Sequence, residues 1–182
     1  MEDIAKNSPL QVAIAWTGPK VISTEIPDEH LKETSLLLKR PPFIWENYFA
    51  NDGPRNCKFL KLKPYAGRSN QCLSLSEGHG FNLMNQPELS KILFLASKFS
   101  LIDALESEVA FKKAITKLCP KALEEIILNN RETFLNEGLD KINDTDKISL
   151  LEKLKLINHP ISSEIINWLN GEYNVGSECL TD

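Results

Sequence analysis

Several classes of protein are excluded by features that this 182-residue sequence lacks. No apolar run approaches the ~18 residues of a membrane span. The residues from Met1 to Lys6 show no basic segment followed by an apolar one, which a signal peptide requires. The net charge of −4 argues against a broad surface for nucleic acid or anionic membrane. We therefore expect a soluble protein of the cytoplasm, unless residues ahead of Met1 carry a targeting signal.

Cysteine and histidine, which supply most metal sites and many nucleophiles, are sparse and scattered. The four cysteines form no C-x-x-C pair, and the three histidines lack the ligand spacing of a zinc site. The G-x-S-x-G and P-loop motifs are also absent. We expect reduced thiols, no metal and no cofactor. The residues concerned are Cys57, Cys72, Cys119, Cys179, His30, His79 and His159.

Strand and helix patterns alternate over the first half of the chain. Leu10 to Trp16 form an almost continuous apolar run, which is typical of a strand buried on both faces. Asp28 suits the N-cap of a helix that runs to Lys39 and stops before two prolines. Phe43 then begins a second apolar strand. The order strand, helix, strand predicts a βαβ unit with parallel strands.

A third strand and a series of helices are predicted after this unit. Residues 79–83 favour a strand, and we interpret Gly78-His79-Gly80 as a kink at the strand end rather than a phosphate cradle. Pro87 fits the first turn of a helix. After about residue 103 the strand patterns disappear. The spacing of apolar residues then predicts helices near 109–118, from Pro120 to a stop at Gly138, near 146–156 and near 160–169.

The predicted fold is therefore α/β followed by all-α. At this length the chain holds one ordinary domain or one piece of a larger one. Two or three parallel strands do not close a sheet, and a buried strand with an open edge is prone to aggregation unless something covers it. Three solutions stay open: the helices cover the edge, another chain completes the sheet, or the sequence is a fragment.

Three stretches resemble one enzyme family in their order and spacing. They are Trp16 to Ser23, Pro42 to Gly53 with the following Pro64 to Arg68, and Asn82 to Lys91. The W-x-N-x-x-x-N-D string within the second is specific. Together they resemble the last βα units of the β-N-acetylglucosaminidase barrel, glycoside hydrolase family 84, which includes O-GlcNAcases and bacterial hyaluronidases. The resemblance implies that residues 1–103 are the C-terminal part of an incomplete (β/α)8 barrel of TIM type, and that residues 104–182 are the helical bundle that follows it in bacterial members.

The resemblance also implies four sugar-binding residues, which are Trp45, Asn47, Asp52 and Asn82. A pyranose ring needs an apolar wall and fixed polar groups for its hydroxyls. Trp45 would supply the wall, Asp52 would accept two hydroxyl hydrogen bonds, and each asparagine offers a donor and an acceptor. Without the resemblance, Trp45 would be a core aromatic, and the polar residues would be turn or capping residues. Tyr65 and Arg68 are expected to pin a loop, and Glu46 replaces the aspartate usual in the family.

The chemistry that the resemblance implies needs two adjacent aspartates. One orients the acetamido group of the substrate, whose carbonyl oxygen attacks the anomeric carbon to give an oxazoline, and the other acts as general acid and then as general base. No Asp-Asp pair occurs in this sequence. Asp144-Thr145-Asp146 has the wrong spacing and suits the start of a helix. We therefore expect no catalytic residue here and no hydrolysis of terminal β-linked N-acetylglucosamine by this chain alone.

Three hypotheses about function remain at this point. The chain is part of a β-N-acetylglucosaminidase that is either truncated or split, and the missing half, which lies on a second chain if the enzyme is split, carries the acids. Alternatively, it is a non-catalytic protein that binds N-acetylglucosamine, in a glycan or a glycoprotein, or docks a protein partner by its strand edge. The third hypothesis is a degenerate gene product. The intact helix caps and regular alternation favour continued use or recent loss of function over long decay.

Overall fold

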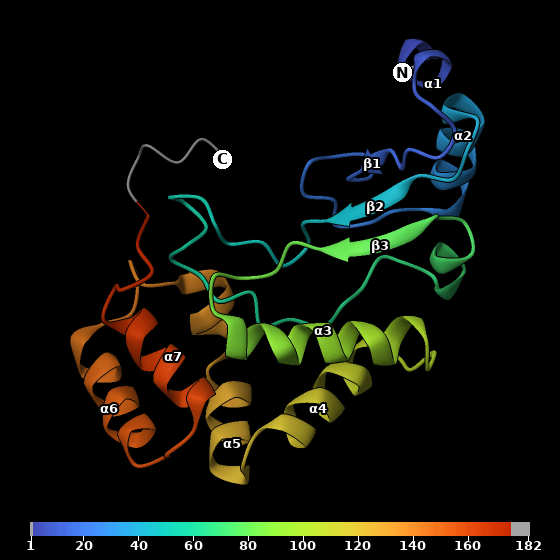
Figure 1. Cartoon of the computed structure of the whole chain (residues 1–182). Coiled ribbons are helices and arrows are strands. Elements are labelled where there is room, and N and C mark those ends of the chain that lie inside the picture. The colour runs from blue at the N-terminus through green and yellow to red at the C-terminus, as the bar shows by residue number, and fades with distance from the viewer. Residues whose placement is uncertain (1, 176–182) are drawn as a thin grey trace.

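A computed structural model describes residues 2–175, in which a small parallel sheet adjoins a set of helices (Figure 1). The elements in chain order are α1 (Glu2–Asn7), β1 (Ala15–Trp16), α2 (Asp28–Leu38), β2 (Phe43–Glu46), the 3-10 helix η1 (Asn70–Leu73), β3 (Gly78–Phe81), α3 (Pro87–Leu101), α4 (Ser107–Leu118), α5 (Lys121–Asn129), the π-helix η2 (Thr133–Glu137), α6 (Asp144–Lys155) and α7 (Pro160–Leu169).

The sheet has the strand order β1-β2-β3, and both strand pairs are parallel. Ala15 lies opposite Phe43, and Phe43 lies opposite Gly78. The prediction of a βαβ unit followed by a third strand is therefore confirmed. All three strands point their carboxyl ends toward the same edge of the sheet, where the β2 and β3 arrowheads lie together in Figure 1.

The first strand is much shorter than predicted. Only Ala15 and Trp16 pair in the sheet, while Leu10 is 77% exposed, so the prediction of a buried strand over residues 10–16 is wrong. The segment before the strand forms a turn instead, in which the Val12 amide donates to the Pro9 carbonyl. The carbonyls of those two residues accept hydrogen bonds from the Arg40 guanidinium, at 2.9 and 2.6 Å. A side-chain donor thus takes the place of a neighbouring strand.

The helix that follows β1 forms as predicted but starts differently. The N-cap residue of α2 is Pro27, and Asp28 is the first helical residue, so its prediction as the N-cap is wrong. The Asp28 carboxylate accepts a hydrogen bond from the Ser69 hydroxyl at 2.7 Å, which leaves it turned toward another loop. The helix stops at Leu38, before the two prolines, and Lys39 adopts a left-handed conformation with φ 57°.

The two faces of the sheet have different environments. Side chains alternate along β2, and Ile44 is buried in a small core with Ile26 and Leu31, whereas Trp45 on the opposite face is 47% exposed. Phe43 lies on the same face as Trp45 and packs over two glycines of β3. The helices therefore cover one face, and the face that bears Trp45 is open to solvent.

The two glycines of β3 are part of the strand and not of a kink at its end. A Cβ atom on Gly78 would lie 2.7 Å from Cε2 of Phe43, and one on Gly80 would lie 3.0 Å from Cε1. The sequence interpretation as a strand-end kink is therefore wrong, because these glycines make room for an aromatic ring on the neighbouring strand.

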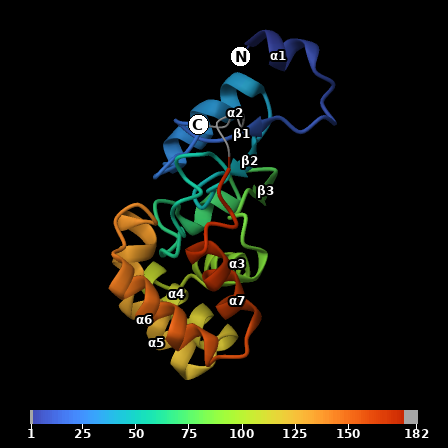
Figure 2. The ribbon, with the colours of Figure 1, turned by 90° about the vertical axis from the view of Figure 1, so that its left-hand side faces the viewer.

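The later helices follow the prediction with one exception. Helix α3 begins at Pro87 as predicted, and its apolar residues Leu89, Ile92, Leu93, Ala96 and Phe99 are buried. The helix predicted from Pro120 to Gly138 is divided, because α5 ends at Asn129 and the π turn η2 follows. One hydrophobic core runs from Phe49, after β2, to Leu169 in α7. Figure 2 shows the sheet at one end of the molecule and α4 to α7 at the other.

Three further findings concern the cysteines, possible membrane spans and possible metal ligands of the described residues. Cys57, Cys72 and Cys119 are free and buried, while Cys179 lies outside the described residues. Within residues 2–175, no helix has the length and apolarity to cross a membrane. No group of three or more potential metal ligands occurs in the same range.

Candidate functional site

Two asparagines meet at the carboxyl edge of the sheet. Asn47 directly follows β2, and Asn82 directly follows β3. The ladder continues past the strand ends, since the Asn82 amide donates to the Glu46 carbonyl at 2.9 Å. The Asn82 side chain also donates to Oδ1 of Asn47 at 3.0 Å. Two residues that the sequence proposed for one site are therefore in direct contact.

The Asn47 side chain is fixed on both sides. Its Nδ2 donates to the Val21 carbonyl at 2.9 Å, while its Oδ1 accepts from Asn82. Asn47 is 8% exposed, whereas Asn82 is half-buried. Asn47 thus connects the loop after β1 to Asn82 and orients its amide, which leaves Asn82 as the more accessible of the two.

Trp45 lies next to this pair on the open face of the sheet. Alternation along the strand places it on the same side as Asn47, two residues later. Its exposure of 47% rules out the alternative of a core aromatic. An exposed indole beside two fixed amides is the type of surface against which a sugar ring packs.

Asp52 lies half-buried in the loop after β2, and the residue before it anchors that loop. Asn51 is fully buried, and its Nδ2 donates to the Phe59 carbonyl and to Oε1 of Gln86, both at 2.9 Å. Its Oδ1 accepts from the Asn85 amide at 2.8 Å. Sequence reasoning missed this role of Asn51, because two of its three partners lie 34 and 35 positions away along the chain.

A buried ion pair supports the site from behind. The Glu46 carboxylate, 1% exposed, accepts from Nε and Nη2 of Arg68 at 2.7 and 2.8 Å. It also accepts from the Tyr65 hydroxyl at 2.8 Å and from the Tyr48 amide at 3.0 Å. Burial alone raises the pKa of Glu46, but its contact with His79 and the charge of Arg68 outweigh burial and hold that pKa below the ordinary 4.5.

Arg68 connects this pair to the loop after β1. Its Nη2 donates to the Ser23 carbonyl at 2.7 Å, and its Nη1 donates to the carbonyls of Thr24 and Ala66 at 2.7 and 3.1 Å. With the two bonds to Glu46, all five guanidinium hydrogens have acceptors. The expectation that Arg68 pins a loop is confirmed.

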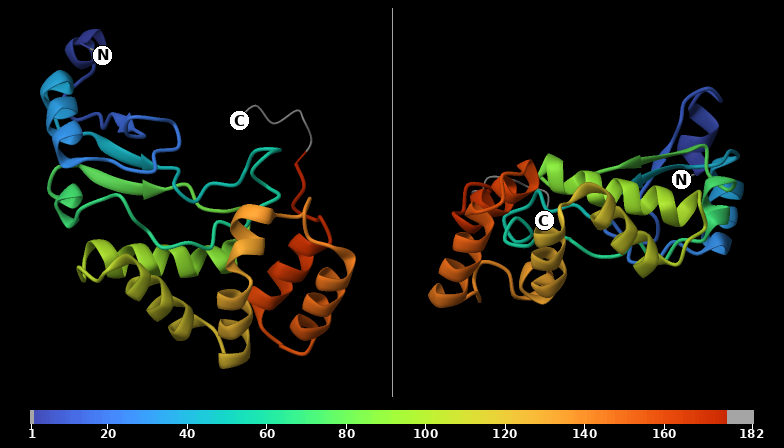
Figure 3. Two further views of the ribbon diagram at one scale, coloured as in Figure 1. Left: turned by 180° about the vertical axis from the view of Figure 1, so that it is seen from behind. Right: turned by 90° about the horizontal axis from the view of Figure 1, so that it is seen from below.

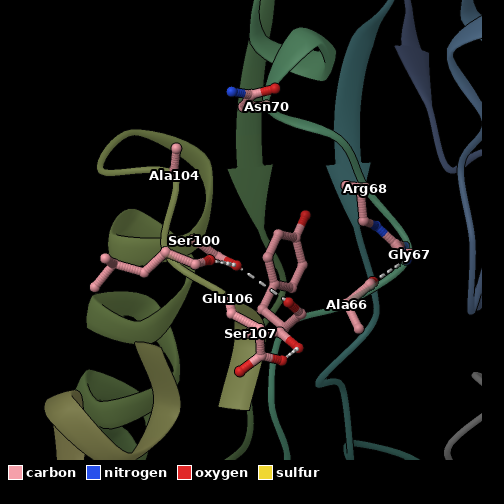
Figure 4. A pocket seen from close by; sticks show the side chains of 10 residues that line it. Ala66, Gly67, Arg68, Asn70, Ser100, Ala104, Glu106 and Ser107 are labelled. Carbon is pink, nitrogen blue, oxygen red and sulfur yellow. Dashed lines mark hydrogen bonds between the residues drawn. The ribbon is translucent and has the colours of Figure 1, made fainter. Parts of the chain in front are cut away.

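A separate hollow lies between the segment at residues 65–70 and the turn before α4 (Figure 4). Its volume is about 350 Å³, and Arg68 and Glu106 are its charged residues. Arg68 is already saturated, and the Glu106 carboxylate caps α4 by accepting from the amides of Glu108 and Val109. Because its charged groups are committed to the fold, this hollow is a weaker candidate than the carboxyl edge of the sheet.

The chain is similar to proteins of one enzyme family. The family model of beta-N-acetylglucosaminidase matches residues 1–129. Over 67 residues, or 37% of this chain, the sequence is 46% identical to the proteins named Protein O-GlcNAcase from Rattus norvegicus and Mus musculus, and this stretch spans 7% of the length of each.

A solved structure shares the fold. A point mutant of an O-GlcNAc hydrolase from Thermobaculum terrenum superimposes with a TM-score of 0.75 at 22% identity. The match covers 94% of this chain and 44% of the other, so this chain spans less than half of that protein. The likeness supports the predicted combination of an α/β part with following helices.

Proposed function

This chain belongs to the β-N-acetylglucosaminidase family of glycoside hydrolases, and from that premise we propose that it forms one part of a pocket for terminal β-linked N-acetylglucosamine. In this proposal Trp45 is the wall of the pocket, and Asn47, Asp52 and Asn82 are its polar groups. The relatives named O-GlcNAcase and O-GlcNAc hydrolase indicate a glycoprotein as the substrate class.

The contact between Asn47 and Asn82 is the observation that carries the proposal. Their hydrogen bond of 3.0 Å fixes two amides at the carboxyl ends of neighbouring parallel strands. Active sites of α/β barrels form at this edge. Fixed amides lose little conformational freedom when a sugar hydroxyl binds, so the arrangement favours binding.

We propose further that the chain binds the sugar but does not hydrolyse it alone. The sequence contains no Asp-Asp pair to polarise the acetamido group and protonate the leaving oxygen. Within the described residues, β1 pairs only with β2, and Ala15 and Trp45 are exposed on the open face. Further strands from polypeptide outside this sequence would pair with β1 and bring the acids to the pocket.

Turnover of a chromogenic N-acetyl-β-glucosaminide tests the catalytic part of the proposal. We expect no product from the purified chain alone, and product when it is mixed with a polypeptide that carries the first strands of a family barrel and the aspartate pair. Product from the isolated chain would refute the proposal, because the sequence would then hold an acid that we have not identified.

Titration with methyl N-acetyl-β-glucosaminide, followed by NMR, tests the binding part. We expect Asn82→Ala to raise the Kd about tenfold, since it removes one or two fixed hydrogen bonds. Asn85→Ala is the matched control, because it removes the side-chain amide of an exposed residue three positions later in the same segment. Equal affinities of the two variants would exclude Asn82 from the pocket.

A non-catalytic sugar-binding protein is the second candidate. The absence of an Asp-Asp pair from the sequence favours it. If the chain binds the glycoside but no mixture with a second polypeptide forms product, this function is favoured over that of a split enzyme.

A further inference from the structure

The loop that bears Asp52 extends from the sheet to the helices at the far end of the molecule (Figures 1 and 3). Three backbone groups of residues 57–60 form hydrogen bonds there. The Cys57 carbonyl accepts from Nε1 of Trp168 at 3.2 Å, the Lys58 carbonyl accepts from the amide of residue 139 at 3.1 Å, and the Leu60 amide donates to the Phe134 carbonyl at 2.8 Å. These partners lie in η2, in the turn after it and in α7.

The side chains around these bonds are closely packed. Trp168 and Phe134 are fully buried, and their rings meet edge to face at 5.8 Å. A Cβ atom on Gly138 would lie 2.7 Å from the Phe59 ring and 2.8 Å from the Lys58 carbonyl, so only glycine fits. Close packing of this kind defines a single position for the loop.

Helix α7 also holds the segment that follows β3. The Glu164 carboxylate accepts from the amides of Glu88 and Leu89, at 2.9 and 2.8 Å, in the first turn of α3. This turn begins five residues after Asn82. Glu164 and Trp168 are four residues apart and lie on the same face of α7. One helix face therefore contacts both segments that leave the carboxyl edge of the sheet.

We infer that α7 positions the two loops of the candidate sugar pocket, with Trp168 acting on the Asp52 loop and Glu164 acting on the Asn82 segment. Asp52 lies between two anchors, Asn51 before it and residues 57–60 after it, and the second anchor belongs to the helices. The consequence for sugar affinity rests on the proposed function, but the ordering of the loops does not. Trp168 and Glu164 are positioning residues and touch no substrate in this scheme.

Trp168→Phe in the full chain tests the inference, with Trp16→Phe as its matched control. Each change removes one indole donor and keeps an aromatic ring, since Nε1 of Trp16 donates to His30 on the other side of the molecule at 3.0 Å. Hydrogen exchange read by NMR should be about tenfold faster at the Leu60 amide in Trp168→Phe and unchanged in Trp16→Phe. Unchanged exchange at Leu60 would overturn the inference.

Glu164→Gln is a second variant, which decides the matter if Trp168→Phe does not fold. Glutamine keeps one acceptor oxygen, so one of the two α3 amides loses its partner, and exchange at Glu88 or Leu89 should rise about tenfold. In both variants the Kd for methyl N-acetyl-β-glucosaminide should rise threefold or more, by about the effect of one hydrogen bond. Faster exchange with an unchanged Kd would overturn the positioning role.

The two proposals fail separately in this experiment. If the wild-type chain binds no glycoside, the proposed function is refuted, and hydrogen exchange at Leu60, Glu88 and Leu89 alone decides whether α7 orders the loops. If the wild-type chain binds the glycoside and both variants bind it equally well, the proposed function stands and the inference falls.

Discussion

Some residues of this protein stabilise the fold and others belong to the candidate pocket. The buried pair of Glu46 and Arg68 shows how a residue of the first kind supports residues of the second. Glu46 precedes Asn47, and its carboxylate holds Arg68, which in turn holds the carbonyls of Ser23 and Thr24. The Asn47 side chain bonds the Val21 carbonyl in the same loop. The ion pair therefore supports the backbone from which the pocket residues project.

At the residue scale we predict a pH dependence that belongs to Glu46. Its pKa is lowered by folding, so its charged form stabilises the fold above pH 4.5 and this contribution disappears as the pH falls below that value. Glu46→Gln should cost about 3–5 kcal/mol near neutral pH, because it leaves Arg68 buried without a counter-charge. The difference from wild type should shrink below pH 4.5.

Urea unfolding at several pH values measures both effects. Glu29→Gln is the control, because the Glu29 side chain is 73% exposed and its pair with Lys32 spans 3.3 Å at the surface. A constant difference between wild type and Glu46→Gln across the acid range would contradict the prediction.

At the scale of elements, a single side chain, that of Arg40, binds several carbonyls of the N-terminal segment. Arg40 is 8% exposed and donates to five carbonyl groups, four of which belong to residues 5–12. Ala5 is buried where α1 contacts α2, but the turn that follows has few other contacts, since Leu10 is 77% exposed and Val12 is 47% exposed. Its order therefore depends on the guanidinium group.

Arg40→Lys should release the segment while the rest of the fold remains. Lysine has three donors where arginine has five, so at least two carbonyls lose their partner. We expect chymotrypsin to cleave after Leu10 about tenfold faster than in wild type, with an unchanged far-UV spectrum. Arg131→Lys, where one nitrogen bonds Glu108 at 2.7 Å, is the control. Equal cleavage rates in all three proteins would show that other contacts hold the segment.

At the scale of the whole molecule, a small core holds Ile44 of β2, and one large hydrophobic core joins the segments that leave the sheet to the helices. It includes Phe49 beside the sheet, Leu93 in α3 and Leu154 in α6. The sequence predicts a change of architecture near residue 103, and whether that change is a domain boundary stays a prediction. A shared core favours one cooperative unfolding transition.

Leu154→Ala tests this cooperativity. Leu154 is fully buried, so its truncation should cost about 2–5 kcal/mol, and the sheet amides should lose protection together with the helix amides. Leu156→Ala, two residues later and 87% exposed, should change stability by less than about 0.5 kcal/mol. If hydrogen exchange showed loss of protection in the helices only, residues 104–182 would be a separate unit.

The sequence patterns predicted those structural features that depend on residues close together in the chain. The βαβ unit, the position of α3 and most later helices follow from apolar spacing and from prolines, which act over a few residues. The family followed from three motifs in order. The predictions were wrong where a residue distant in the chain determines the local structure. Arg40 binds the carbonyls before β1 that a neighbouring strand would otherwise bind, and the Phe43 ring needs the space left by the glycines of β3.

The sequence by itself therefore determined the family, the element order and the residue types available to the pocket. Only the tertiary structure decided that Asn47 and Asn82 touch, that Trp45 faces solvent, and that Trp168 holds the loop of Asp52. The physical reason is that Trp168 and Cys57 lie 111 positions apart, and no periodicity or local propensity encodes such a distant contact. It forms because the hydrophobic core that contains Trp168 also contains Leu60, three residues after Cys57.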